Sequence, residues 1–268
     1  MTSRERAASD PRTSLVDTAV GPVSVTDEGP PDATPLLCVH GIPGSARDFR
    51  YLAPALAHRF RVIRVEMPGF GGSPPQSPAR LQKWARTLLA VAAWATPGRF
   101  MLLGHSFGGG AVLLAAATAG DRLAGAVLLA SMGARRHRAF TLPAAVYAGV
   151  SALLSVPGVR APLVTATRRI YEGNGLPVPA RGDWRTVRRH VRLLASVRFA
   201  ALGAAARAIQ APALVLHAED DRLVQVSIAR ELAALLPHGR LEVFPDGGHH
   251  LQKTRVAGVA AAMEAFFG

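Results

Sequence analysis

Short runs of apolar residues alternate with longer stretches of mixed polarity along most of the chain. Continuous apolar runs of this kind predict strands that are buried on both faces, and apolar residues at helical spacing predict the helices between them. The expected strands are residues 36–39, 61–65, 100–103, 126–129, 213–217 and 241–244. The expected helices are 46–57, 81–95, 107–119, 226–236 and a last one toward Phe267. The pattern predicts an α/β fold with a mostly parallel sheet covered on both faces.

The alternation stops near residue 133 and resumes at residue 213. We therefore expect residues 133–207 to form an inserted helical cap, and residues 15–132 and 208–268 to form the core domain. Residues 1–14 are polar and lack the apolar run that a signal peptide requires. They are expected to be a flexible N-terminal tail.

The longest uncharged stretch, residues 139–159, lies in the expected cap. Pro143 and Pro157 leave about thirteen residues between them, whereas ~20 apolar residues are needed to cross a bilayer. The stretch predicts a buried or interfacial helix instead. Packing in the interior is the more common role of such a run; the alternatives are lining an acyl pocket or touching a membrane surface.

The composition contains 49% hydrophobic residues, which excludes a disordered chain. Cys38 is the only cysteine in the sequence, so no disulfide framework can form, and a cytoplasmic location is expected. The formal net charge of +13 ordinarily suggests nucleic acid or anionic membrane as a partner. We expect no nucleic acid, because aromatic residues do not alternate with the arginines.

The positive charge is concentrated in the expected cap. Residues 133–207 hold thirteen arginines and no lysine against Glu172 and Asp183, which leaves a charge of only +2 for the rest of the chain. Asp183 is a candidate helix cap, and two sets of residues at helical spacing follow it. The apolar set is Trp184, Val187, Val191 and Leu194, and the basic set is Arg185, Arg188, Arg189 and Arg192. This basic amphipathic helix indicates either a solvated face or a surface for anionic lipid or an acidic partner.

Residues 104–108, with the sequence GHSFG, place Ser106 where an expected strand ends and an expected helix begins. Glycines two residues on either side of a serine permit a sharp strand-to-helix turn that lifts the hydroxyl clear of the sheet. The free N–H groups and the dipole at the N-terminus of that helix then stabilise negative charge that develops beside the hydroxyl during a reaction. A helix start with a capping serine is the alternative. The strand before Ser106 and the helix after it favour a nucleophile.

Four further motifs accompany this turn: 39–44 (VHGIPG), 66–73 (EMPGFGGS), 216–224 (LHAEDDRLV) and 246–250 (DGGHH). Together, and in this order, they resemble the α/β-hydrolase superfamily from about Leu15 to the end of the chain. The resemblance implies an α/β-hydrolase fold with an inserted cap and Ser106 as the catalytic nucleophile. Glu66 stands where the family usually has aspartate, which puts the hydrogen bonding of that loop in question.

The acid of the implied catalytic triad follows the expected strand 213–217. Both Asp220 and Asp221 stand there, and either could bind one imidazole nitrogen. Matching Leu223 and Val224 to the end of the family pattern favours Asp221, with Asp220 as a loop charge or helix cap.

The base is expected to be His249, because the two glycines before it resemble the family's histidine loop. His250 is adjacent and is expected to point elsewhere. The resemblance also implies that the backbone N–H groups of Ile42 and Phe107 form an oxyanion hole. The sequence contains no cluster with metal-ligand spacing and no phosphate-binding glycine loop, so we expect no cofactor and no metal.

These residues predict a hydrolase that cleaves a small or medium carboxylic ester, apolar or anionic, through an acyl-enzyme. Relatives that open epoxides or displace halides use aspartate where this chain has Ser106, which argues against both reactions. Thioesterase, lactonase, C–C bond hydrolase and haloperoxidase-like activities stay open. A catalytically silent fold that binds a ligand or partner through its basic cap is a further alternative, and peripheral membrane contact through the cap is another open possibility.

Overall fold

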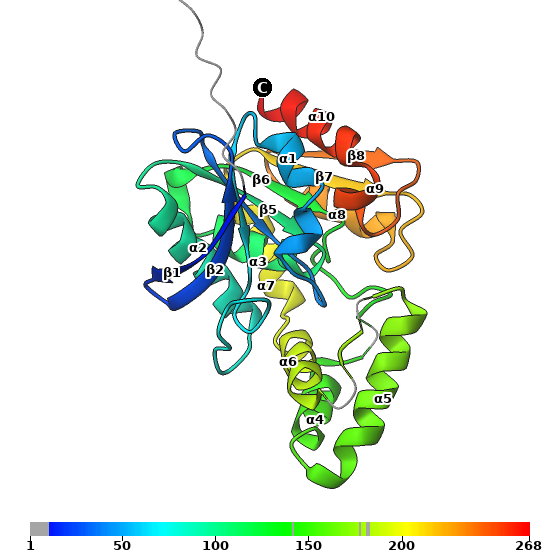
Figure 1. The fold of residues 1–268 in the computed structure, drawn as a ribbon. Helices are drawn as coiled ribbons and strands as arrows, with labels where there is room; N and C mark the ends of the chain where they lie inside the picture. Colours follow the sequence, from blue (N-terminus) through cyan, green and yellow to red (C-terminus); the bar gives the residue numbers. More distant parts are fainter. Residues whose placement is uncertain (1–10, 141, 177, 181–182) are drawn as a thin grey trace, which may run out of the picture.

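The computed structural model describes residues 11–140, 142–176, 178–180 and 183–268. In these ranges eight strands form one sheet in the order β1-β2-β4-β3-β5-β6-β7-β8 (Figure 1). The strands are β1 Arg12–Thr18, β2 Gly21–Glu28, β3 Pro35–Val39, β4 Arg61–Val65, β5 Phe100–His105, β6 Leu123–Leu129, β7 Ala213–Ala218 and β8 Gly239–Phe244. From β4 to β8 all neighbouring strands are parallel, as the apolar runs predicted.

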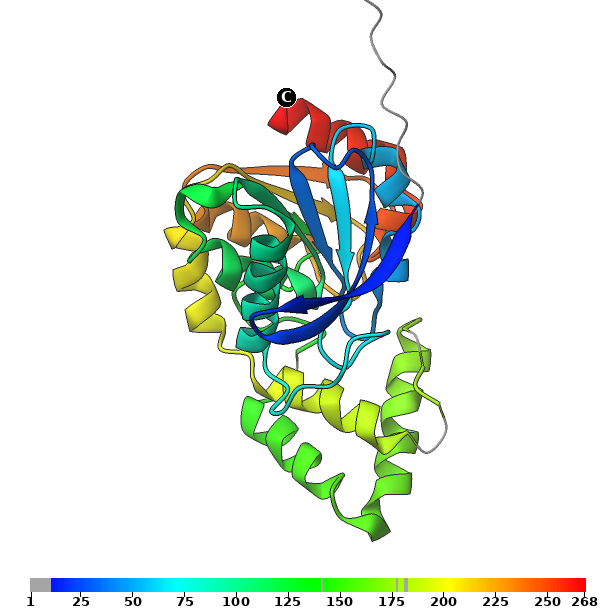
Figure 2. The ribbon, with the colours of Figure 1, turned by 60° about the vertical axis from the view of Figure 1, so that its left-hand side comes forward.

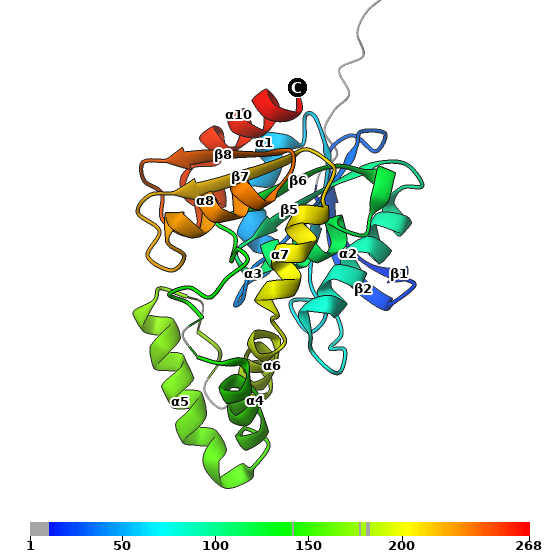
Figure 3. The ribbon, with the colours of Figure 1, turned by 180° about the vertical axis from the view of Figure 1, so that it is seen from behind.

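Helices cover both faces of the sheet, which confirms the expected α/β fold. The helices are α1 Leu52–Leu56, α2 Leu81–Ala95, α3 Phe107–Ala116, α4 Ala144–Leu153, α5 Pro157–Gly173, α6 Trp184–Ala195, α7 Phe199–Ala208, α8 Val226–Leu235, α9 Leu251–Thr254 and α10 Val256–Phe267, with short 3-10 turns η1 Ala46–Phe49 and η2 Gly120–Arg122. Helices α2, α3, α7 and α8 enclose one apolar core around Trp84 and Leu88 (Figure 3). Helices α1 and α10 enclose the other, around Leu56 and Met263.

An N-terminal hairpin that the apolar pattern did not predict extends the sheet. Strands β1 and β2 are antiparallel, and β2 pairs with β4 so that Val25 lies opposite Val65. Most of β1 is exposed, so its side chains carry no long apolar run. Arg12 to Ser14, which we assigned to the flexible tail, are instead the first residues of β1. Residues 1–10 of that expected tail lie outside the described residues.

The cap projects from one end of the core as three helices, α4, α5 and α6 (Figures 1 and 2). It has a small apolar centre of its own, made by Leu154, Val164, Val187 and Val191. Helix α7, which the sequence boundary at residue 207 assigned to the cap, packs on the core instead. The reason is its apolar face, since Leu202, Ala205 and Ala206 are buried in the core cluster on the α3 side of the sheet.

We expected the apolar stretch 139–159 to be packed in the protein interior. Along most of its length it is not. Val146, Leu153 and Val156 are 42–50% exposed, and Ser151 is the buried residue of α4. In the described part of the cap, α4 packs on α6 and α5, and the opposite face of α4 is exposed (Figure 2). None of the helices in the described ranges has both the length and the apolar character needed to cross a bilayer.

Candidate active site

Ser106 occupies the sharp turn between β5 and α3. Its backbone has φ +54° and ψ −119°, a strained conformation for a residue other than glycine. The flanking glycines make the turn possible, because a Cβ on Gly104 would lie 2.7 Å from the Gly108 oxygen and one on Gly108 would lie 2.6 Å from the His40 oxygen. The turn therefore presents the Ser106 hydroxyl at the carboxyl end of β5.

A continuous chain of hydrogen bonds joins Ser106, His249 and Asp221. The Ser106 hydroxyl lies 2.8 Å from Nε2 of His249, and Nδ1 of the same ring lies 2.8 Å from Oδ2 of Asp221. A proton on Nδ1 donates to the carboxylate and leaves Nε2 to accept from the hydroxyl. The structure thus brings together the three residues that the sequence singled out. Their catalytic role stays a prediction.

The two adjacent aspartates have different environments. Asp221 is buried, and its Oδ1 accepts the backbone N–H groups of Leu223 and Val224 at 2.8 and 3.0 Å. Asp220 is exposed and accepts the backbone N–H of Gly248 at 2.8 Å. Burial acts to raise the pKa of Asp221, but the hydrogen bond and charge of His249 and the Val224 N–H together hold that pKa below its ordinary value. Asp221 is therefore suited to stay ionised beside His249.

His105 supports the histidine loop, a contact that the sequence did not reveal. Its Nε2 donates to the backbone oxygen of His249 at 2.8 Å. Burial, and then the neighbouring His249 and His250, lower the pKa of His105 well below its ordinary value, which keeps the ring neutral. His250 packs its ring 5.3 Å from that of His105, away from the Ser106 hydrogen bond. The sequence signal was only that His105 lies inside the serine motif.

The loop after β3 lies directly against Ser106. A Cβ on Gly41 would lie 2.9 Å from Cβ and 3.3 Å from Oγ of Ser106, so the backbone there makes close contact with the hydroxyl. Ile42 follows Gly41, and Phe107 is the first residue of α3, where the helix leaves backbone N–H groups without an internal partner. Both N–H groups that we expected to form an oxyanion hole therefore belong to backbone next to Ser106, and that role stays a prediction.

His40 holds this loop in place. Its Nδ1 donates to the Gly41 oxygen at 2.8 Å, and its Nε2 accepts the Met67 N–H at 3.2 Å. Glu66 supports the same region, since its carboxylate accepts the Ala46 N–H at 3.2 Å. The longer side chain at this position thus reaches the backbone of η1 through Oε1, whereas Oε2 is buried without a hydrogen-bond partner among the described residues. Burial raises the pKa of Glu66.

A groove of about 310 Å³ separates the loops of the core from the cap. Its core walls are residues 43–45 and 69–71, and Arg189 and His190 of α6 line the cap side. The Arg189 guanidinium donates to the Gly69 oxygen, and the His190 ring stacks on Phe70 with 5.3 Å between centroids. Arg189 therefore contacts the core. Neither of two roles considered for the basic face of this helix, exposure to solvent alone or binding to a lipid surface, requires such a contact.

The histidines and Asp221 of this site are not arranged as a metal-binding cluster. In the described ranges no group of three or more histidine, cysteine, aspartate or glutamate residues is arranged to hold a metal ion. The residues that converge on Ser106 are suited to proton transfer and to attack on a carbon atom.

The chain matches the model of the alpha/beta hydrolase family over residues 36–262. It is 29% identical over 266 residues to the magnesium-chelatase 30 kDa subunit of Rhodobacter capsulatus, covering 90% of each protein. It is 28% identical over 285 residues to the 2-hydroxymuconate semialdehyde hydrolase of Pseudomonas sp. (strain CF600), covering 98% of this chain and 93% of that protein. A solved structure of a hydrolase from Pseudomonas aeruginosa PA01 shares the fold, with a TM-score of 0.72 and 23% identity over 96% of this chain and 98% of that one.

Proposed function

The chain belongs to the alpha/beta hydrolase family, and we propose that it is a serine hydrolase whose catalytic triad is Ser106, His249 and Asp221. The proposed substrate is a small or medium carboxylic ester. The observation that carries the proposal is the pair of 2.8 Å contacts that link the carboxylate of Asp221 through His249 to the Ser106 hydroxyl. Such a chain is the arrangement that activates a serine for attack on a carbonyl carbon.

The proposed reaction begins when Nε2 of His249 takes the Ser106 proton while Oγ bonds to the ester carbonyl carbon. Negative charge moves to the carbonyl oxygen, where the N–H groups of Ile42 and Phe107 stabilise it. Each such donor contributes on the order of 3 kcal/mol in the transition state. When the tetrahedral intermediate collapses, the bond to the leaving oxygen breaks, and that oxygen takes the proton from His249. The acyl group is then an ester of Ser106.

Water completes the proposed cycle. His249 takes one proton from the water molecule while the water oxygen attacks the acyl carbon. The Ser106 oxygen then leaves and takes that proton from His249. The products are a carboxylic acid and the free serine. Asp221, held ionised, stabilises the imidazolium that forms in both halves of the reaction, because its carboxylate accepts the Nδ1 proton.

The lining of the groove between core and cap begins at Pro43, next to Ile42, and does not include Ser106, so the groove is proposed to hold the part of a substrate away from the reacting carbonyl. Its volume of about 310 Å³ lies at the lower end of the range for sites that hold small organic molecules. Phe70 and Pro179 supply apolar surface and Arg189 supplies a positive charge, while the Asp48 carboxylate in the same lining is paired with Lys253 at 2.9 Å. We therefore include both apolar and anionic esters in the proposed substrate class.

Covalent labelling with a fluorophosphonate tests the proposal. We expect wild-type protein to gain one label at Ser106, located by peptide mass spectrometry, and Ser106→Ala and His249→Ala to lose it. His238→Ala is the matched control, because His238 is an exposed histidine outside this site, and it should label at the wild-type rate. Absence of labelling in folded wild-type protein would contradict the triad and favour a silent fold that binds a ligand or partner through its cap.

Hydrolysis of a carbon–carbon bond is a second candidate function. It is favoured by the similarity to the 2-hydroxymuconate semialdehyde hydrolase, which extends over 98% of this chain. Comparing kcat/KM for p-nitrophenyl butyrate with that for 2-hydroxymuconate semialdehyde separates the two candidates. A value at least about a hundredfold higher for the second compound would replace the ester proposal.

A further inference from the structure

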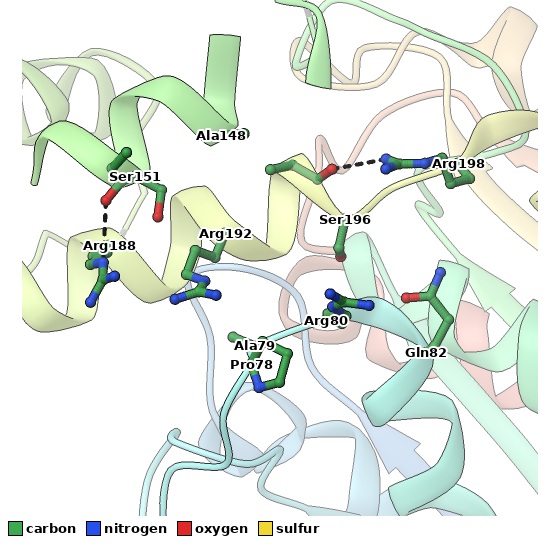
Figure 4. Close-up of a pocket in the computed structure, with 12 residues that line it drawn as sticks. Pro78, Ala79, Arg80, Gln82, Ala148, Ser151, Arg188, Arg192, Ser196 and Arg198 are labelled. Atoms are coloured by element: carbon green, nitrogen blue, oxygen red, sulfur yellow. Dashed lines mark hydrogen bonds between the residues drawn. The ribbon is translucent and has the colours of Figure 1, made fainter. Parts of the chain in front are cut away.

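A second cavity lies between cap and core, with a lining that shares no residue with the groove or with the Ser106 site. Its volume is about 540 Å³. Helices α4 and α6 of the cap form one wall, and residues 78–82 at the start of α2 form the other (Figure 4). The N–H of Leu81 donates to Ser196 Oγ at 2.9 Å, so cap and core are joined beside the cavity.

Four arginines line this cavity: Arg80, Arg188, Arg192 and Arg198. They come from both walls, with Arg80 on the core side and Arg188 and Arg192 on α6, whereas the Arg198 side chain turns toward the Ala195 carbonyl (Figure 4). No aspartate or glutamate contributes to the lining. Positive charges around a concave surface without an acidic side chain in its lining favour the binding of an anion.

The guanidinium groups are only partly satisfied by the protein. Arg188 donates to the backbone oxygen of Ser151 at 3.2 Å, and Arg198 donates to that of Ala195 at 3.0 Å. In the part of the chain that the structure describes, Arg80 and Arg192 have no side-chain hydrogen bond and none of the four arginines has a carboxylate partner. Surface arginines elsewhere do pair with acids, as Arg135 does with Glu231.

The remaining lining of the cavity is mixed, with polar side chains from Gln82, Ser151 and Ser196 and apolar ones from Pro78 and several alanines. Four alanines contribute to it: Ala79, Ala148, Ala152 and Ala195. Guanidinium groups bind phosphate oxygens through pairs of parallel hydrogen bonds, and several of them together match a doubly charged phosphate. The alanines leave room for an organic group attached to such a phosphate.

We propose that this cavity is a binding site for a small ligand that carries a pyrophosphate or a doubly charged phosphate group. The concave shape favours a small molecule over a flat lipid surface or an extended acidic peptide. Because its walls come from α6 and from residues 78–82, the ligand contacts cap and core together. Binding therefore stabilises the observed arrangement of the two parts, by an amount that grows with ligand concentration.

Isothermal titration of inorganic pyrophosphate into the full chain tests the proposal, in about 0.15 M salt so that distant charges are screened. We expect saturable binding to wild-type protein. Replacing Arg192 or Arg80 by alanine removes charge-assisted hydrogen bonds and should raise Kd by about tenfold or more. Arg169→Ala is the matched control, because Arg169 is an exposed cap arginine outside the cavity, and its Kd should stay within about twofold of wild type.

Thermal unfolding supplies a second readout on the same proteins. Pyrophosphate should raise the Tm of wild type and Arg169→Ala but not that of Arg192→Ala. If Arg192→Ala fails to fold, Arg192→Lys replaces it, since lysine keeps the charge and loses the paired geometry, and a weaker Kd is again expected. Absence of binding to wild-type protein, or an equal loss in Arg169→Ala, would overturn the proposal.

Discussion

Asp221 and His249 are joined by a hydrogen bond of 2.8 Å between Oδ2 and Nδ1. The adjacent Asp220 takes no part in this contact and accepts the Gly248 N–H instead, also at 2.8 Å. Two carboxylates that are neighbours in the sequence therefore act on the same histidine loop in different ways. One contacts the imidazole, and the other supports the backbone before it.

Replacing each aspartate by asparagine separates these roles. We expect Asp221→Asn to lower kcat/KM for an ester by about 10⁴-fold, because an amide that donates to Nδ1 favours the wrong tautomer of His249. Asp220→Asn keeps a carbonyl oxygen for the Gly248 N–H and should lose less than about tenfold. Initial rates of p-nitrophenyl ester hydrolysis measure both. Equal losses in the two variants would contradict the assignment of Asp221.

Gly41→Ala is expected to impair turnover more than stability. The new Cβ would lie 2.9 Å from Cβ of Ser106 and 3.4 Å from Nδ1 of His105, so the loop that carries Ile42 must shift. A displacement near 1 Å at a reacting group costs about 10²-fold in rate, and we expect a loss in kcat of that order.

Gly149→Ala is the matched control for this substitution. A Cβ on Gly149 meets nothing within 4 Å, and the residue lies inside α4. Alanine should stabilise the helix by about 0.5–1 kcal/mol and leave kcat unchanged. If thermal unfolding shows that Gly41→Ala has lost its fold, the expectation that turnover suffers more than stability is wrong. If its kcat equals that of Gly149→Ala, the close approach at Ser106 does not limit catalysis.

Glu66→Gln is expected to become more stable relative to wild type as the pH rises. Burial raises the pKa of Glu66 in the folded protein, so its protonated form stabilises the fold below the unfolded-state pKa of about 4.3. That contribution is lost as the pH increases through the raised folded-state pKa. Glutamine is neutral throughout and can still accept the Ala46 N–H.

Thermal unfolding at pH 4 and pH 7 measures the difference in Tm between Glu66→Gln and wild type. We expect the difference to favour the variant more at pH 7. Glu242→Gln, at a partly exposed position on β8, is the control for removing a carboxylate that is not buried. A difference for Glu66→Gln that does not change with pH would contradict the burial argument.

Salt is expected to affect anionic and neutral esters differently. Arg189 lines the groove beside the loop that follows Ile42, and the cap carries most of the excess positive charge of the chain. Raising the salt from 0.01 to 1 M shortens the screening length from about 30 to about 3 Å. The value of kcat/KM should fall several-fold for a carboxylate-bearing ester and stay nearly constant for its neutral methyl analogue. Equal salt dependence would mean that the arginines do not attract substrate.

The sequence by itself determined the features that depend on local pattern. Buried parallel strands are continuous apolar runs, so all six parallel strands were predicted to within three residues at either end. The glycines around Ser106 marked the strand-to-helix turn, because two backbones approach there too closely for any side chain. The order of the motifs also indicated the family to which the chain belongs.

Only the tertiary structure decided the relationships between distant segments. The contacts of Asp221 and His105 with His249 join residues 28 and 144 positions apart, and no local pattern reports such a distance. The pairing of β1 with β2 uses backbone groups and leaves little trace in side-chain polarity. Likewise, α7 lies on the core and α4 has an open face because of what surrounds each helix, although both are rich in apolar residues. Burial is a property of the neighbours of a segment, and the chain brings those neighbours together only when it folds.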